Sequence, residues 1–289
     1  MAAVAERIAI MADVHANLAA LRATLADAAA QGATRIVVAG DLVGFGPQPN
    51  ATVDLLRERG ATLVRGNHEQ DYVGQYGQAT IRERWQTDRR FASLCWYLDR
   101  LGDDRSTLLT ALPTEHWLDD ATLVTHGSPR HIRDGIKAET PDDVLRTMFA
   151  ASAATVAFVG HTHRQLIRVF GGRMVVNVGS VGTPLDDDPR AAYVLATRPA
   201  DVATGSWTIA PRRVAYDIAE TIAAYADGLR QVAPAFCAVM ERQLRTGHSF
   251  VGPWLRLSNG LRADQERAAL ARFLALPTPR PVNPVAVPR

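Results

Sequence analysis

At the start of the chain, short apolar runs alternate with longer segments that have helical character. Leucines at helical spacing follow Asn17 up to Gly32, which predicts a helix with an asparagine N-cap and a glycine stop. A second predicted helix follows Asn50 as its N-cap and ends at Gly60. Strands and helices in alternation with tight loops predict right-handed βαβ crossovers and a parallel sheet. The strand-like runs are residues 7–13, 35–41 and 62–67.

Residues 71–121 break this alternation. The amphipathic stretch 80–102 predicts one long helix, whose aromatic residues we expect to pack into the core. Further on, Thr140 as N-cap and Pro141 at the first helical position predict a helix over 140–152. A final helix is predicted over 219–244, with a kink at Pro234.

The second half of the chain also contains strand-like runs. Gly171 and Gly172 predict the turn of a hairpin, and Pro211 predicts that the last strand lies at a sheet edge. The runs are residues 122–127, 155–163, 165–180, 191–197 and 205–218. We expect one domain over 1–247 and an extension over 248–289, whose proline-rich tail from 276 is expected to be unfolded or draped over the surface.

Polar side chains of a few types follow the strand-like runs directly. In an open α/β sheet, the loops beyond the carboxyl ends of parallel strands form the ligand crevice. We therefore expect these side chains to converge on one edge of the sheet. They are Asp13, His15, Asp41, Asn67, His68, His126, His161 and His163.

This donor set indicates a metal centre. Imidazole, carboxylate and amide donors without thiolate suit Mn, Fe, Co, Ni or Zn. Seven ligands, with His68 as an eighth group, are too many for one tetrahedral ion, but two ions that share a carboxylate would use them. Taken singly, an aspartate after a strand is more often a cap, and a lone histidine is more often a satisfied side chain. Five such motifs in series favour the metal interpretation.

Composition narrows the class of protein. The chain has 289 residues, 47% hydrophobic and 21% charged, and a net charge of +2, which does not indicate a polyanion-binding surface. Cys95 and Cys237 lie in apolar stretches and are expected to be buried free thiols, with a disulfide between them as the alternative. No apolar run approaches the ~20 residues that span a bilayer. Glu6 and Arg7 stand before a short apolar strand, without the apolar region and cleavage site of a signal peptide. We expect a cytoplasmic protein.

The series "DVH", "GDLVG", "GNHE", "THG" and "GHTH" resembles the calcineurin-like metallophosphoesterase superfamily. The phrases "HGSPR" and "NVGSVGTPLDDDPRAAYVL" resemble its small YfcE-like phosphodiesterase branch of bacteria and archaea. The resemblance covers about residues 7–247. It implies an α/β fold, a four-layer α-β-β-α sandwich of two mixed β-sheets with flanking helices, and a dinuclear centre at the sheet edges.

The resemblance also implies roles for the individual residues. Asp41 would bridge two divalent ions, for which Mn²⁺ is the first expectation and Fe, Zn, Ni or Co are the others. His68 would be an outer histidine that faces the leaving group. One departure from the "GDxVDRG" motif of the phosphoprotein phosphatases is that Gly44 and Phe45 stand where Asp and Arg would be. The first ion would be held by Asp13, His15 and His163, and the second by Asn67, His126 and His161.

A phosphodiesterase is therefore the first expectation. A hydroxide that bridges the two ions would attack phosphorus, and His68 would protonate the departing oxygen. Arg130, Arg164 and, with less support, Asn17 are candidate substrate contacts, and the excursion 71–121 is expected to shape the pocket. Diadenosine tetraphosphate hydrolysis, and phosphomonoester or phosphoprotein hydrolysis, stay open as alternatives. So does a binding scaffold without catalysis, like the retromer subunit that has this fold. The expected partner is a small phosphoester, without a nucleic-acid surface or a membrane, and a homo-oligomer stays open.

Overall fold

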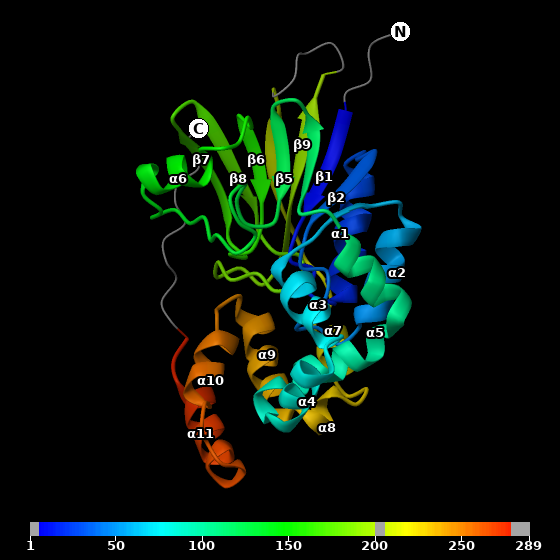
Figure 1. The fold of residues 1–289 in the computed structure, drawn as a ribbon, viewed down its shortest axis with the longest axis vertical. Helices are drawn as coiled ribbons and strands as arrows, with labels where there is room; N and C mark the ends of the chain where they lie inside the picture. Colours follow the sequence, from blue (N-terminus) through cyan, green and yellow to red (C-terminus); the bar gives the residue numbers. More distant parts are fainter. Residues whose placement is uncertain (1–5, 200–205, 279–289) are drawn as a thin grey trace.

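The computed structural model describes residues 6–199 and 206–278 and places them in two β-sheets that lie face to face, with helices outside (Figure 1). Each sheet has five strands and mixes parallel with antiparallel pairs. The predicted α/β class and four-layer sandwich are therefore confirmed. The first sheet has the order β10 (Thr208–Val214), β9 (Ala191–Arg198), β1 (Glu6–Met11), β2 (Arg35–Ala39), β3 (Thr62–Val64). The second has the order β4 (Glu115–Asp119), β5 (Thr122–Thr125), β6 (Val156–Val159), β8 (Arg173–Val178), β7 (Gln165–Phe170).

The strand pairing agrees with the sequence signals. β1, β2 and β3 are parallel neighbours, as the alternating pattern predicts. β10, which contains Pro211, lies at the edge of its sheet and pairs only with β9 among the described strands. β7 and β8 form the predicted hairpin, and its turn residues Gly171 and Gly172 have φ of 52° and 76°. Positive φ at both turn residues matches the right-handed twist of the strands.

Each central strand is buried on both faces. Ile8 and Ile10 of β1 pack in one cluster with residues of the second sheet such as Phe158, whereas Ala9 and Met11 pack in the cluster that includes helix α1 (Leu18–Ala30). Because neighbouring side chains on a strand point to opposite faces, burial of both faces requires an unbroken apolar run. The cysteines Cys95 and Cys237 are free and buried, as expected.

The helices that follow β1 and β2 begin differently from each other. Asn17 caps α1, and its side chain accepts a hydrogen bond from the backbone N–H of Ala20 at 3.2 Å, as predicted. The predicted cap at Asn50 is wrong, because α2 (Pro49–Glu58) has Gln48 at its N-cap and Pro49 in its first turn. Asn50 lies inside the helix, where its amide donates to the carbonyl of Arg100 at 2.8 Å.

The single helix predicted over 80–102 is also wrong. The chain leaves helical geometry at Asp88, whose φ and ψ are −106° and 113° and whose carboxylate accepts from the N–H of Arg90. A second break lies at Gly102, where φ is 72°. At Asp88, the hydrogen bond of the side chain to the backbone competes with helical hydrogen bonding.

The chain between β3 and β5 consists of η1 (His68–Val73), α3 (Gly74–Tyr76), α4 (Ala79–Thr87), η2 (Arg89–Phe91), α5 (Ala92–Ala111) and strand β4.

Two further predictions of helices need correction. The helix predicted over 140–152 is α6 (Asp142–Met148), and Thr140 does not cap it, because its hydroxyl accepts from the N–H of Lys137. The helix predicted over 219–244 is three helices, separated at Gly228 (φ 90°) and before Pro234. They are α7 (Ile218–Ala224), α8 (Leu229–Val232) and α9 (Pro234–Thr246).

Residues 248–275 form two more helices, α10 (Val251–Leu257) and α11 (Ala263–Ala275), which lie beneath the sheets beside α9 (Figure 1). Phe250, Trp254 and Phe273 are buried in the main core cluster. Most of the proline-rich tail, from residue 279, lies outside the described residues. The division of the chain at 247 stays a prediction. Among the described residues, no helix combines the length and the apolar character that crossing a bilayer requires.

Candidate metal centre

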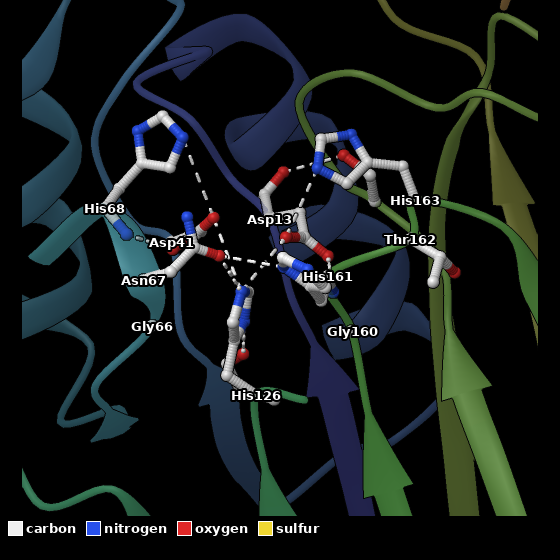
Figure 2. Close-up of polar contacts among 12 residues, drawn as sticks. Asp13, Asp41, Gly66, Asn67, His68, His126, Gly160, His161, Thr162 and His163 are labelled. Carbon is white, nitrogen blue, oxygen red and sulfur yellow. Dashed lines mark hydrogen bonds and ion pairs between the residues drawn. The ribbon is translucent and has the colours of Figure 1, made fainter. Parts of the chain in front are cut away.

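The eight predicted side chains meet where strands of the two sheets end, and most of them are drawn in Figure 2. Asp13 and His15 follow β1, Asp41 follows β2, and Asn67 and His68 follow β3. The second sheet contributes His126 after β5 and His161 and His163 after β6. Asp13, His15, Asp41, His68, His126 and His163 are buried, and three sets of them have ligand atoms within 4.8 Å of one another. The sets are Asp13, His15 and His163; His15, Asp41 and His68; and Asp13, Asp41 and His126.

The backbone at five of these positions is left-handed. A positive φ is rare for residues other than glycine, because the Cβ atom then crowds the backbone. Such conformations persist only where the surrounding structure holds them, and they concentrate at functional sites. The φ angles are 52° at Asp13, 47° at His15, 53° at Asp41, 67° at His161 and 58° at His163.

Two glycines make room for the carboxylates. A Cβ atom at Gly66 would lie 2.2 Å from Oδ1 of Asp41, and one at Gly160 would lie 2.6 Å from Oδ2 of Asp13. The same two oxygens accept backbone hydrogen bonds, from His68 N–H at 2.8 Å and from His161 N–H at 2.9 Å. The remaining oxygens, Oδ2 of Asp41 and Oδ1 of Asp13, therefore face the centre, and the buried Oδ1 of Asp13 has no hydrogen-bond partner.

Three imidazole rings are oriented by carbonyl groups. Nδ1 of His15, His126 and His163 lies 3.2, 2.8 and 2.7 Å from the carbonyl oxygens of Val43, Ala39 and Thr183. Since a carbonyl can only accept, each neutral ring carries its hydrogen on Nδ1 and points the lone pair of Nε2 at the centre.

In the neutral rings of His15 and His163, the two Nε2 lone pairs then face each other without a donor. Nε2 of His15 lies 3.1 Å from Nε2 of His163, and Oδ1 of Asn67 lies 2.9 Å from Nε2 of His126. The same amide oxygen lies 2.8 Å from Nδ1 of His161. Buried acceptors that face each other are costly unless a cation lies between them. The seven residues therefore fit a pair of divalent cations, with imidazole, carboxylate and amide donors that suit borderline metals.

The charges of the site favour a cation. Burial works to raise the pKa of Asp41, but His126, His68 and His15 hold it well below its usual range. Burial and the neighbouring histidines keep the pKa of His15 low, and burial with His126 lowers that of His161 to about 4. Burial also disfavours the charged form of His126, yet Asp41 and Asp13 raise its pKa to about 10. The carboxylates of Asp41 and Asp13 therefore stabilise a positive charge where Nε2 of His126 lies.

His68 is held by aromatic packing. Its ring lies 5.0 Å from the ring of Phe45 and 4.8 Å from that of Tyr72, both nearly perpendicular to it. Its buried Nδ1 has no hydrogen-bond partner, and its Nε2 lies 3.9 Å from Oδ2 of Asp41. A Cβ atom at Gly44 would lie 2.6 Å from Nδ1, so this position has no room for a carboxylate. Among the described residues, no carboxylate therefore orients His68 through Nδ1.

Sequence reasoning missed the role of Glu69. This fully buried carboxylate accepts from the N–H groups of Asp41 and Gly66 through Oε2, each at 2.9 Å. Its Oε1 accepts from Leu42 at 2.8 Å and from Val43 at 3.3 Å. Burial and the charge of Asp41 raise its pKa to about 7, against the effect of these hydrogen bonds. Glu69 thus joins the loops after β2 and β3. The letters "GNHE" contain it, but nothing in them shows that it turns inward.

The three predicted substrate contacts lie in different surroundings. Asn17 is saturated, because it caps α1, accepts from the hydroxyl of Thr221 at 2.8 Å and donates to the carbonyl of Gly182 at 2.8 Å. Arg130 pairs with Asp134 on its own loop, and Arg164 is exposed. Their contact with a substrate stays a prediction.

Comparisons with known proteins agree with this geometry. The model of the calcineurin-like phosphoesterase superfamily domain matches residues 7–199. An uncharacterized protein from Methanocaldococcus jannaschii is 27% identical over 216 residues, which are 65% of this chain and 81% of that protein. The crystal structure of a metallophosphoesterase from Sphaerobacter thermophilus is similar, with 30% identity, a TM-score of 0.65, and coverage of 83% of this chain and 99% of that one. A hypothetical protein from Pyrococcus horikoshii has the same fold, with 19% identity, a TM-score of 0.69, and coverage of 84% and 99%.

Proposed function

Because the chain belongs to the calcineurin-like phosphoesterase superfamily, we propose that it is a metal-dependent phosphoesterase with two divalent ions and that its substrate is a phosphodiester. The observation that carries this proposal is the set of carboxylate, amide and imidazole atoms that point at one centre and could bind metal. These are Oδ1 of Asp13, Oδ2 of Asp41, Oδ1 of Asn67 and the ring nitrogens that face them. Oδ1 of Asp13, at the middle of the set, is buried without a hydrogen-bond partner.

Asp13, His15 and His163 would hold one ion, Asn67, His126 and His161 would hold the other, and Asp41 would contact both. When bound, the ions supply a lowered pKa for water and neutralise phosphoryl oxygens. The carbonyl groups of Val43, Ala39 and Thr183 keep three of the rings in one tautomer and orientation. Glu69 keeps the loop of Asp41 in register with that of Asn67.

His68 lies on one side of Asp41, whereas His163 lies on the other, beside Asp13 (Figure 2). In this position the imidazolium of His68 would donate its proton to the departing oxygen. Burial lowers the pKa of His68 against the effect of Asp41, which makes its imidazolium a stronger proton donor.

Two other enzymatic activities suit the same centre, since the metal ions would contact only the phosphoryl group of a substrate. They are hydrolysis of diadenosine tetraphosphate and hydrolysis of phosphomonoesters, including phosphoproteins. A binding scaffold without catalysis is disfavoured by the complete donor set, because a protein that does not bind metal has no need for buried unpaired acceptors.

The test is a panel of phosphodiesters, dinucleoside polyphosphates and phosphomonoesters, assayed with the purified protein after reconstitution with Mn²⁺, Fe²⁺, Zn²⁺, Ni²⁺ or Co²⁺. We expect turnover that chelation abolishes, with Mn²⁺ as the best metal and a diester as the best substrate. A monoester or a dinucleoside polyphosphate as the best substrate would replace the diester assignment. Full metal occupancy without turnover of any substrate would favour the scaffold.

A further inference from the structure

The loop that follows β5 crosses from the second sheet toward His68. Near its start, Ser128 donates to Asp134 at 2.5 Å and accepts from the N–H groups of Arg130 and His131 at 3.1 and 3.2 Å, which makes this part of the loop compact. At Gly135 the loop lies against the second sheet's ligands, since a Cβ atom there would be 3.4 Å from Thr162 and 3.9 Å from His161. The loop is therefore anchored beside the metal centre.

Arg133 connects this loop to the opposite side of the centre. Its guanidinium pairs with Asp71 of η1, the helix that begins at His68. Asp71 is buried, whereas the Arg133 side chain is 53% exposed. A guanidinium has five N–H donors. The carboxylate therefore fixes the direction of the side chain, and the remaining donors stay available to a ligand.

Tyr72 directly follows Asp71 in η1 and contacts His68. Its ring centroid is 4.8 Å from that of His68 and 6.0 Å from that of Trp85, which fixes the ring. Burial raises the pKa of Tyr72, Asp71 and Asp41 raise it further, and Arg133 opposes them. The hydroxyl thus stays protonated as a donor, and the charges of both Arg133 and Asp41 act on it.

We propose that Arg133 and Tyr72 form a binding subsite for a negatively charged leaving group, next to His68. This inference rests on the proposed function, because it places the leaving group on the side of His68. The substrates that fit are diesters whose departing alcohol carries a carboxylate or a further phosphate. Arg133 pairs with the anion, Tyr72 donates a hydrogen bond to it, and His68 protonates the bridging oxygen.

The same loop offers a matched control. Arg130 is three residues away, its side chain is 46% exposed, and it also pairs with an aspartate. Both carboxylate oxygens of Asp134 hold it, with Nε at 3.0 Å and Nη2 at 2.9 Å. Asp134 belongs to the same loop, so this pair does not reach across the metal centre. Removal of Arg130 therefore changes the loop's charge by the same amount without changing the subsite.

The test compares two diesters, phenyl methyl phosphate and its 4-carboxyphenyl counterpart. The quantity measured is the ratio of kcat/KM for the charged ester to that for the neutral one, with bound metal quantified in each protein. Because Arg133 is half exposed, we expect Arg133→Ala to lower this ratio about three- to tenfold. Tyr72→Phe should lower it less. Arg130→Ala should leave the ratio unchanged, because the predicted contact of Arg130 with the phosphoryl group would affect both esters alike. Calorimetric binding of phenylphosphonate and 4-carboxyphenylphosphonate should show the same order.

Asp71→Asn distinguishes a role of Arg133 in binding the leaving group from a purely structural role of the Arg133–Asp71 ion pair. The asparagine amide can still accept a hydrogen bond from Arg133 and keep its direction, so if Arg133 binds the leaving group, loss of the counter-charge alone keeps or raises the ratio. If the ion pair only holds the loop in place, Asp71→Asn and Arg133→Ala should lower kcat/KM for the charged and the neutral ester alike. That result would overturn the proposed subsite. A ratio that Arg133→Ala does not change would overturn it as well, with the phosphodiesterase activity intact. Failure of the wild type to hydrolyse either ester would refute the phosphodiesterase proposal and the subsite together.

Discussion

Oδ2 of Asp41 lies 3.4 Å from Nε2 of His126, and the same oxygen lies 3.8 Å from Nε2 of His15. The other oxygen of Asp41 is occupied by the N–H of His68. One carboxylate oxygen thus lies between the ligands of both proposed metal positions, whereas His126 belongs to one position only. This asymmetry makes the two residues distinguishable by experiment.

We expect Asp41→Asn to reduce metal occupancy at both positions, because the neutral amide attracts cations less and its oxygen can no longer serve two of them equally. His126→Ala should mainly empty the second position. Elemental analysis of reconstituted proteins measures both effects, with Arg130→Ala as a control of unchanged stoichiometry. One ion or fewer in fully reconstituted wild type would contradict the dinuclear centre.

His68→Ala should affect esters according to their leaving group. Protonation matters when the departing oxygen is strongly basic, so an alkyl or nucleoside ester should lose up to roughly 10²–10⁴-fold in kcat/KM. A 4-nitrophenyl ester should lose little, because nitrophenolate leaves without a proton. Metal content should stay near that of the wild type.

His116→Ala is the matched control for His68, since His116 lies on β4, where it is only partly buried. It should change neither ester. Equal losses for the two ester types in His68→Ala, or a loss of bound metal, would show that His68 positions phosphate or supports a ligand instead.

Glu69→Gln should weaken metal binding without removing a ligand. The substitution turns one of two acceptor oxygens into a donor that faces backbone N–H groups, so buried donors lose their partner. Such a loss costs about 1–3 kcal/mol. We expect a lower free energy of unfolding for the metal-free protein and a higher dissociation constant for metal, both by titration. Unchanged metal affinity would show that other contacts hold the loop of Asp41.

The residues of the candidate metal centre could be predicted because each follows a strand whose apolar run is visible, and because parallel strands bring their carboxyl ends to one edge. Asp13, Asp41 and His126 are examples. The helix boundaries could not be predicted from the sequence. The break at Asp88, for example, depends on the hydrogen bond that the Asp88 carboxylate accepts from the N–H of Arg90, within a stretch that is amphipathic throughout. Glu69 depends on tertiary placement, because it comes five residues after the end of β3 and nothing in the letters around it shows that it turns inward.

The C-terminal helices should contribute to global stability. Trp254 of α10 is 2% exposed and contacts Phe273 of α11, with ring centroids 5.4 Å apart. We expect Trp254→Ala to lower the free energy of unfolding by about 3–5 kcal/mol. On the same helix Leu257 is 51% exposed, and Leu257→Ala should stay within about 0.5 kcal/mol of the wild type. Chemical denaturation measures both, and equal effects would mean that α10 is not part of the core.

The left-handed backbone at five proposed metal ligands has an evolutionary consequence. Each such residue costs about 1–2 kcal/mol that glycine would not cost. The proposed role in metal binding accounts for aspartate and histidine at positions where glycine would be less strained. A descendant released from metal binding would gain stability as these residues drift toward glycine. Each substitution back from glycine to aspartate or histidine would then lower stability. The fold can therefore persist after metal binding is lost, whereas metal binding is not readily regained.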